Sequence, residues 1–199
     1  MPKAKEKKQT EKYSKLEEVL IQVGLRIARR AEGALMIVGK VKYKTLVEQK
    51  VPPFKIVDNP KLLESLALID GAVVIDKKGM LQVYGAMIET TNTLMNFGTR
   101  HSAALSASQN NNLVVLVSEE DRKVKLLKNG KMIIQIDPYQ KDIDKSIPYA
   151  VQILESIGAG TVGAIGTSLL APGFGIAFIP GIVIFGSAYY ISKLIKDKL

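Results

Sequence analysis

The spacing of apolar positions divides most of the chain into short helices and strands. Apolar residues recur every three or four positions within 16–27, and this period predicts a helix from Ser14 to about Ala31. Gly33 follows, and the unbroken apolar run at 34–38 predicts a buried strand. A shorter helix is predicted over 60–68, where a proline occupies a tolerated first position.

Four further apolar runs pair around glycine-containing turns, which predicts two hairpins. The paired runs are 72–75 with 80–88, and 124–127 with 132–136. Between the hairpins, the Ala- and Ser-rich residues 99–109 predict a helix, and the apolar run at 113–117 predicts a second buried strand. Helices mixed with strands, some of them joined as hairpins, favour an α/β fold with a mixed sheet.

The C-terminal third changes character, because no Asp, Glu, Lys or Arg occurs from Ser156 to Ser192. Pro172 and Gly173 divide this stretch into two apolar halves, at about 149–170 and 176–195. A membrane-spanning helix needs roughly 20 mostly apolar residues. Each half is close to that length, so we expect a C-terminal apolar helical hairpin.

The charges around this hairpin favour a membrane. Lysines precede the first half and follow the second, whereas the connection between the halves is uncharged. By the positive-inside rule, both ends lie in the cytoplasm. We therefore expect membrane contact through 149–195 and a location at the cell membrane, with the remaining domain on the cytoplasmic side. The alternative is a soluble cytoplasmic protein in which the hairpin packs inside an oligomer.

Composition sets the domain organisation. The 199 residues, 47% of them apolar, suffice for one medium-sized domain and an appendage. Lysines crowd the first residues of a chain with net charge +9, and we expect residues 1–13 to be a disordered basic tail. The α/β domain then occupies 14–145 and the hairpin 146–199. The absence of cysteine excludes disulfides, cysteine metal sites and thiol catalysis.

Two short motifs are the candidates for chemistry. The first is Asp70-Gly71-Ala72, a carboxylate beside flexible backbone at the start of a predicted strand. The second is Gly98-Thr99-Arg100-His101, which opens a predicted helix and contains the chain's single histidine. Backbone N–H groups at a helix start favour anions, and a guanidinium adds paired hydrogen bonds to phosphate. Together the motifs suit nucleotide phosphate chemistry.

These motifs occur in order with two others, Gly33-Ala34-Leu35 and Val117-Ser118-Glu119-Glu120. In this order and spacing they resemble the diadenylate cyclase family, over about residues 16–136. The resemblance implies a mixed-sheet domain flanked by helices that condenses two ATP molecules into cyclic di-AMP and two pyrophosphates. It also implies a divalent metal, Mg²⁺ or Mn²⁺, and a homo-oligomer, because two domains must face each other about a two-fold axis.

The resemblance also implies roles for individual residues. Asp70 would orient or deprotonate the attacking 3′-hydroxyl, and Asp70 and Glu120 would hold the metal. Arg100 and His101 would act with Asp70 in catalysis by binding phosphates. The further nucleotide-binding residues would be Gly71, Ala72, Ile88, Gly98, Thr99, Ser118 and Glu120.

One position departs from the family motif, which usually closes with a second arginine where this chain has Ser102. Either activity is reduced, or another base such as Lys77 or Arg122 substitutes, or the domain binds nucleotide without turnover. We favour an active cyclase, with a non-catalytic nucleotide sensor as the alternative. A basic nucleic-acid-binding adaptor is a third reading that ranks last, because the chain has 6% aromatic residues and no Trp. We therefore expect no specific nucleic-acid partner.

Overall fold

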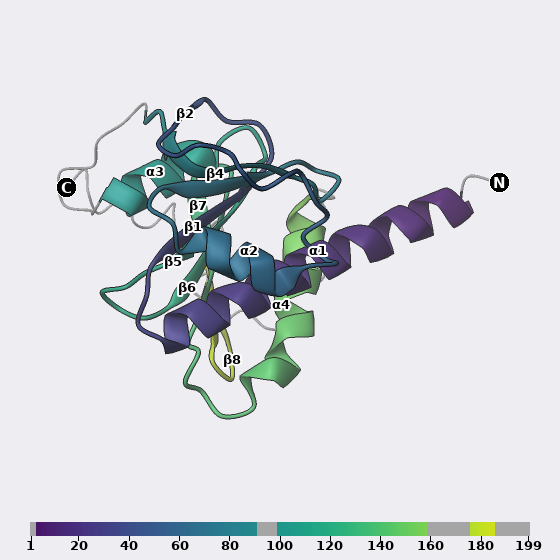
Figure 1. Cartoon of the computed structure of the whole chain (residues 1–199). Helices are drawn as coiled ribbons and strands as arrows, with labels where there is room; N and C mark the ends of the chain where they lie inside the picture. The colour runs from purple at the N-terminus through teal and green to yellow at the C-terminus, as the bar shows by residue number, and fades with distance from the viewer. Residues whose placement is uncertain (1–2, 91–98, 159–175, 186–199) are drawn as a thin grey trace, which may run out of the picture.

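A mixed sheet of nine strands forms the centre of the computed structural model, which describes residues 3–90, 99–158 and 176–185 (Figure 1). The strands are β1 (Ala34–Val38), β2 (Tyr43–Thr45), β3 (Ala72–Ile75), β4 (Leu81–Ile88), β5 (Leu113–Val117), β6 (Val124–Lys128), β7 (Lys131–Ile136), β8 (Ile176–Ile179) and β9 (Ile182–Phe185). Their order is β2-β4-β3-β1-β5-β6-β7-β9-β8. Strands β1 and β3 run parallel, and the other neighbours pair antiparallel.

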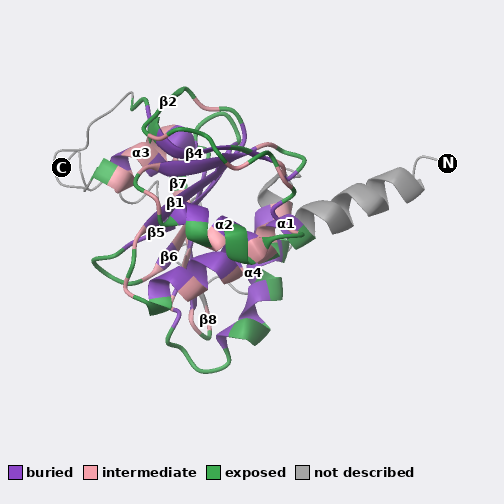
Figure 2. Ribbon diagram, viewed as in Figure 1, coloured by how far each residue is buried: buried purple, intermediate pink, exposed green. Residues whose placement is uncertain are grey.

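Helices cover both faces of the sheet, which produces three layers. They are α1 (Lys3–Arg29), α2 (Pro60–Ala67), α3 (Thr99–Ala107) and α4 (Ile143–Gly158). One buried cluster joins α1, α2 and α4 to one face, and a smaller cluster joins α3 to the other. All five residues of β1 are buried, with Met36 in the first cluster and Ile37 in the second. Figure 2 shows the buried central strands between the helices.

Most of the elements predicted between residues 33 and 136 are confirmed. Both predicted hairpins form, as β3–β4 and β6–β7, and the helices at 60–68 and 99–109 appear as α2 and α3. The edge strand β2 was not predicted. A bulge in β4, where Ala72 pairs with Ala86 but Val74 pairs with Val83, was not predicted either. Gly85 has a φ of +58° at this bulge, a conformation that glycine adopts without strain.

The N-terminal helix is longer than the sequence pattern indicated. It begins at Lys3, so residues 3–13, expected to be a disordered tail, belong to α1, and the predicted start at Ser14 is wrong. The apolar stripe was placed correctly, because Leu16, Leu20 and Ile27 are buried on α1. Many charged residues are also good helix formers, so a lysine- and glutamate-rich segment can extend a helix without burying an apolar stripe.

The expected C-terminal helical hairpin is not what the described residues form. Residues 176–185 are a β-hairpin, in which β9 pairs with β7 and extends the sheet. Its sequence, Ile-Ala-Phe-Ile-Pro-Gly-Ile-Val-Ile-Phe, is rich in β-branched residues and has a Pro-Gly turn. Gly181 adopts a φ of +76° there, as the third residue of a type II turn requires.

The first expected half of that hairpin also belongs to the α/β core as far as it is described. Helix α4 spans the expected boundary at residue 145, and its Ile147, Ala150 and Leu154 lie in the same buried cluster as α1. Residues 159–170 of the first half, the connection at 171–175, and residues 186–195 of the second half lie outside the described residues. In the described ranges, no helix is both long enough and apolar enough to cross a membrane.

Two glutamates, Glu17 on α1 and Glu155 on α4, each have one buried carboxyl oxygen. Glu17 Oε2 and Glu155 Oε1 have no hydrogen-bond partner in the described part of the chain. Burial raises the pKa of Glu17 to about 7, with the Lys128 ammonium lowering it and Glu155 raising it further. Burial likewise lowers the pKa of Lys128. Ionised Glu17 is therefore a destabilising feature of the folded chain.

This burial predicts a pH-dependent gain in stability for Glu17→Gln. The pKa of Glu17 is higher in the folded state, at about 7, than its ordinary value of 4.5, so the folded state binds the extra proton and loses stability as pH rises between those values. The variant should match the parent at pH 4.5 and exceed its free energy of unfolding by roughly 2 kcal/mol at pH 8. Denaturant unfolding at both pH values measures this. The exposed neighbour Glu18→Gln is the control, and an equal effect at both pH values would contradict the account.

Candidate active site

The predicted site residues come from different elements. The direction of the strands brings them to one edge of the sheet, namely the end where β1 and β3 begin. Because β1 and β3 are parallel, Gly33 and Asp70-Gly71 precede neighbouring strands at the same edge. Strand β5 runs antiparallel to β1, with Ala34 opposite Val117, so its last residues lead into Ser118 at that edge. The pairing of Ala72 with Ala86 adds the end of β4.

A pocket of about 910 Å³ lies at this edge. Nine of the ten predicted site residues line it, namely Asp70, Gly71, Ala72, Ile88, Thr99, Arg100, His101, Ser118 and Glu120. The tenth, Gly98, lies outside the described residues. The sequence analysis did not assign the apolar side chains Leu35, Leu46 and Leu116, which also line the pocket, or the half-exposed Met87. The lining therefore combines apolar walls with charged groups from the loop at Asp70, the first turn of α3 and the β5–β6 turn, as small-molecule sites do.

Gly71 allows β4 to approach the start of β3 closely. Its φ is +102°, and a Cβ there would lie 2.8 Å from the backbone nitrogen of Ala86 and 2.9 Å from its oxygen. No side chain fits that space. The Gly71 N–H donates to Asp70 Oδ1 at 3.0 Å, which orients the exposed carboxylate at the pocket.

Arg100 lies in the first turn of α3 and extends across the start of β1. A Cβ on Gly33 would collide with Arg100 Nη1, so the glycine provides the space for the guanidinium. Arg100 Nη1 also lies 3.5 Å from Glu119 Oε2, with side-chain exposures of 42% and 65%. An exposed pair at this distance is weak, so the guanidinium can turn toward an anion at little cost.

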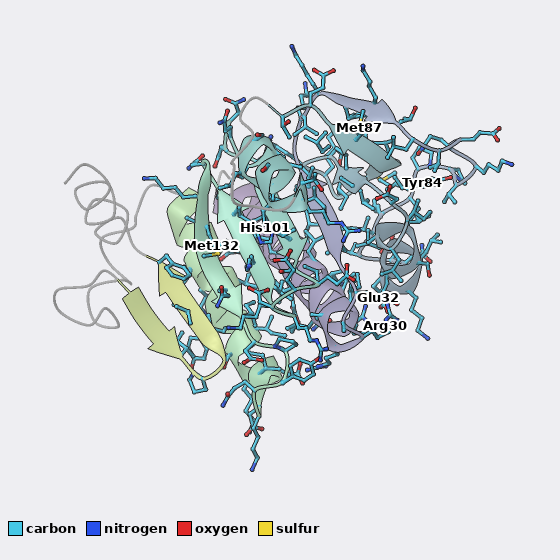
Figure 3. The ribbon with its side chains drawn as sticks, turned by 90° about the vertical axis from the view of Figure 1, so that its left-hand side faces the viewer. Arg30, Glu32, Tyr84, Met87, His101 and Met132 are labelled. Atoms are coloured by element: carbon cyan, nitrogen blue, oxygen red, sulfur yellow. The ribbon has the colours of Figure 1, made fainter. Side chains whose placement is uncertain are left out.

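His101 lies on the sheet face that α3 covers (Figure 3), and a lysine from β6 contacts it. Lys125 Nζ is 3.0 Å from His101 Nε2 and 2.7 Å from Asp121 Oδ2. Burial lowers the pKa of His101, and the Lys125 ammonium lowers it further, whereas Asp121 and Glu120 raise it. The imidazole is therefore neutral at pH 7 in the absence of ligand. Burial raises the pKa of Asp121, but hydrogen bonds from Lys125 and Ser118 outweigh it and leave that pKa below its usual value.

Lys125 is the residue that the sequence analysis missed. The suggested substitutes for the second motif arginine are not supported. Lys77 lies in the β3–β4 turn, at the opposite end of β3 from Asp70, and Arg122 is exposed in the β5–β6 turn and does not line the pocket. Lys125 was detectable only as a charged residue inside an apolar strand, and its position beside Leu116 depends on the β5–β6 register.

The donor set for a metal is small. Asp70, Glu119 and Glu120 line the pocket, but no group of three or more His, Cys, Asp or Glu side chains among the described residues is close enough to hold a metal ion alone. Mg²⁺ is commonly bound by one or two carboxylates together with substrate phosphates and waters. The pocket carboxylates therefore fit a metal that arrives with a nucleotide.

Comparison with known proteins identifies the central part of the chain. The family described as DisA bacterial checkpoint controller nucleotide-binding, abbreviated DAC, matches residues 24–132, which is more than half of the chain. A diadenylate cyclase from Methanocaldococcus jannaschii is 35% identical over 80 residues. That match covers 38% of this chain and 26% of the relative, so it spans about a quarter of the relative's length.

Two solved structures show partial similarity. DacA from Staphylococcus aureus, in a double-mutant form, is 19% identical with a TM-score of 0.49 over 75% of this chain and 97% of that one. A hypothetical membrane spanning protein from Bacillus cereus is 24% identical with a TM-score of 0.42, over 57% of this chain and 60% of that one.

Alanine at the two glycines of this edge should have different effects. In Gly71→Ala the new Cβ meets fixed β4 backbone at a positive φ, so the free energy of unfolding should fall by roughly 1–3 kcal/mol. In Gly33→Ala it meets the end of the Arg100 side chain, which can move, so stability should change by less than about 0.5 kcal/mol. Affinity for ATP should nevertheless weaken about tenfold, because Arg100 is displaced.

Thermal unfolding and titration calorimetry with a non-hydrolysable ATP analogue would measure this pair. If a fully folded Gly33→Ala protein bound the analogue as tightly as the parent, the position of Arg100 would not determine nucleotide affinity, and the prediction would be wrong.

The lone histidine offers a direct measure of the local electrostatics. Its Cε1–H NMR signal needs no assignment, because the chain contains one His. The signal should titrate with a midpoint below 6.5, since burial and Lys125 both disfavour the charged imidazolium. Lys125→Met should raise that midpoint. A parent midpoint at or above 6.5 would contradict the described environment.

Proposed function

This chain belongs to the DisA nucleotide-binding family of diadenylate cyclases, and we propose that its pocket condenses two ATP molecules into cyclic di-AMP. The main support is the gathering of the motif residues around one cavity. The carboxylate of Asp70, the start of α3 and the end of β5 all line it, although they are far apart in sequence.

The start of α3 is the proposed phosphate end of the pocket. Thr99, Arg100 and His101 lie in its first turn, where backbone N–H groups and the helix dipole favour anions. No acidic residue occupies that turn, although Glu119 from the β5–β6 turn lies 3.5 Å from Arg100 Nη1 and would have to release it to a triphosphate. Buried Ile88, on the β4 side of the same pocket, would contact the adenine.

Asp70 is the proposed general base. It is exposed at the pocket, and one carboxylate oxygen accepts a hydrogen bond from Gly71. Asp70 would accept the proton of an ATP 3′-hydroxyl while the 3′-oxygen bonds to the α-phosphorus of the second ATP and pyrophosphate leaves. Two such steps, one in each direction, close the ring and release two pyrophosphates.

Asp70 and Glu120 would hold a Mg²⁺ or Mn²⁺ ion that enters with the nucleotide. When bound, the ion neutralises charge on the phosphates and on the leaving pyrophosphate. Ser118 is buried, lines the same pocket and would also contact the nucleotide.

Two copies of the chain are needed for the reaction. One pocket would hold one ATP, whereas each new bond joins the 3′-oxygen of one nucleotide to the phosphorus of the other. We therefore propose a homo-oligomer in which two pockets face each other about a two-fold axis. The proposal predicts that specific activity rises with protein concentration.

A non-catalytic nucleotide sensor is the second candidate, and Ser102 is the observation that favours it. Ser102 is 7% exposed within α3 and brings no positive charge to the position where the family has an arginine. A charge-assisted hydrogen bond is worth roughly 1.5–3 kcal/mol, so its loss alone would slow turnover without preventing ATP binding.

Product analysis by mass spectrometry distinguishes the two. The purified chain is incubated with ATP and Mg²⁺ or Mn²⁺ beside Asp70→Asn. The parent should form cyclic di-AMP and pyrophosphate in a 1:2 ratio, and the variant should lose activity by about 100-fold or more while still binding ATP, because it lacks the base. ATP binding without product in both proteins would instead establish the sensor.

A further inference from the structure

Ser102 is uncharged at the position where the family motif usually has a second arginine, so the proposed phosphate end of the pocket has one positive side chain fewer. A lysine from another element, Lys125, lies nearby. Lys125 is on β6, 23 residues beyond Ser102 in the chain, yet its ammonium contacts the adjacent motif residue His101. Its side chain is 12% exposed, so it is nearly enclosed. Burying a lysine ammonium is costly unless partners surround it.

Two partners hold this ammonium in place. Asp121 Oδ2 lies 2.7 Å from Lys125 Nζ on one side, and His101 Nε2 lies 3.0 Å from it on the other. Asp121 is four residues before Lys125, and it also interacts with Ser118. The chain Asp121–Lys125–His101 therefore runs from the turn after β5 to the first turn of α3.

The contact defines which ring nitrogen carries the proton. An ammonium has three N–H donors and no acceptor, so His101 Nε2 must accept. The proton of the neutral ring then resides on Nδ1, which is an N–H donor. A charge-assisted hydrogen bond at Nε2 also draws electron density from the ring and makes Nδ1–H a stronger donor.

We propose that Lys125 is a positioning residue that compensates for the missing charge at Ser102. It holds His101 in the Nδ1–H tautomer, and its ammonium polarises the imidazole ring so that Nδ1–H presents more positive charge to the nucleotide phosphates. This inference rests on the proposed function for its substrate, but not for its geometry. Lys125 acts through His101, because His101 lines the pocket and Lys125 does not.

The first test is the tautomer of His101 in the ligand-free chain, by ¹⁵N NMR of the single histidine above its titration midpoint. The parent should show a protonated Nδ1 and an accepting Nε2. Lys125→Met should shift the population toward the Nε2–H form, and Lys61→Met, which removes an exposed charge on α2, should not. An Nε2–H ring in the parent would overturn the proposal whatever the chain's activity.

The second test is a double-mutant cycle on cyclic di-AMP formation. Lys125→Met should lower kcat/KM about 10- to 100-fold, mostly through kcat if the charge acts on the transition state. Lys125→Arg should restore most of the loss. In a His101→Ala background, Lys125→Met should lower kcat/KM little further, because the imidazole through which Lys125 acts on the substrate is already absent.

Fully additive effects in this cycle would show that Lys125 acts without His101 and would overturn the proposal. Ser102→Arg in the Lys125→Met background should recover activity, if the two cations serve the same end of the pocket. If the parent makes no cyclic di-AMP, the same cycle is run on the dissociation constant for ATP. A failed cyclase is then distinguished from a failed role for Lys125.

Discussion

The parallel pairing of β1 with β3, with β5 antiparallel on the other side of β1, is the constraint on which the site depends. It places two strand beginnings and one strand end at the same edge of the sheet. Loops from three distant parts of the chain meet there, and α3 adds its N-terminal turn. Gly71 permits the closest approach, since its φ of +102° and the adjacent β4 backbone exclude any side chain. The position of the pocket thus follows from the sheet topology, and its charged groups come from the loops and from the first turn of α3.

Local patterns predicted the elements of this domain well, because its strands and hairpins carry strong short-range signals. The Asn129-Gly130 turn and the buried run of β5 are examples. The motifs predicted the pocket residues because each motif lies at a strand end or at the start of α3, and the sheet topology brings these points together at one edge. The bulge at Gly85 and the partner of His101 depend on the register between strands, which no local pattern specifies. At the C-terminus, the uncharged stretch predicted apolar helices, but residues 176–185 form a β-hairpin, which their β-branched composition and the Pro180-Gly181 turn favour.

Charged groups are buried in two places with opposite consequences. At the interface of α1 and α4, Glu17 and Glu155 each leave an oxygen unpaired within the described residues, so burial disfavours their ionised forms. At the pocket, Lys125 is paired with both Asp121 and His101. The first arrangement lowers the stability of the folded chain as pH rises toward the raised pKa of Glu17. The second fixes a proton and a charge where the proposed substrate binds. Under the proposal for Lys125, the positive charge missing at Ser102 on α3 is supplied from β6 of the sheet.

The most direct measurement is a crystal structure of the chain with a non-hydrolysable ATP analogue and Mg²⁺. The account predicts the triphosphate at the first turn of α3, beside Arg100 and His101, with the adenine against Ile88 and the 3′-hydroxyl near Asp70. It also predicts that Lys125 stays on His101 Nε2 in the complex. A nucleotide bound outside this pocket, or with its triphosphate away from α3, would contradict the account.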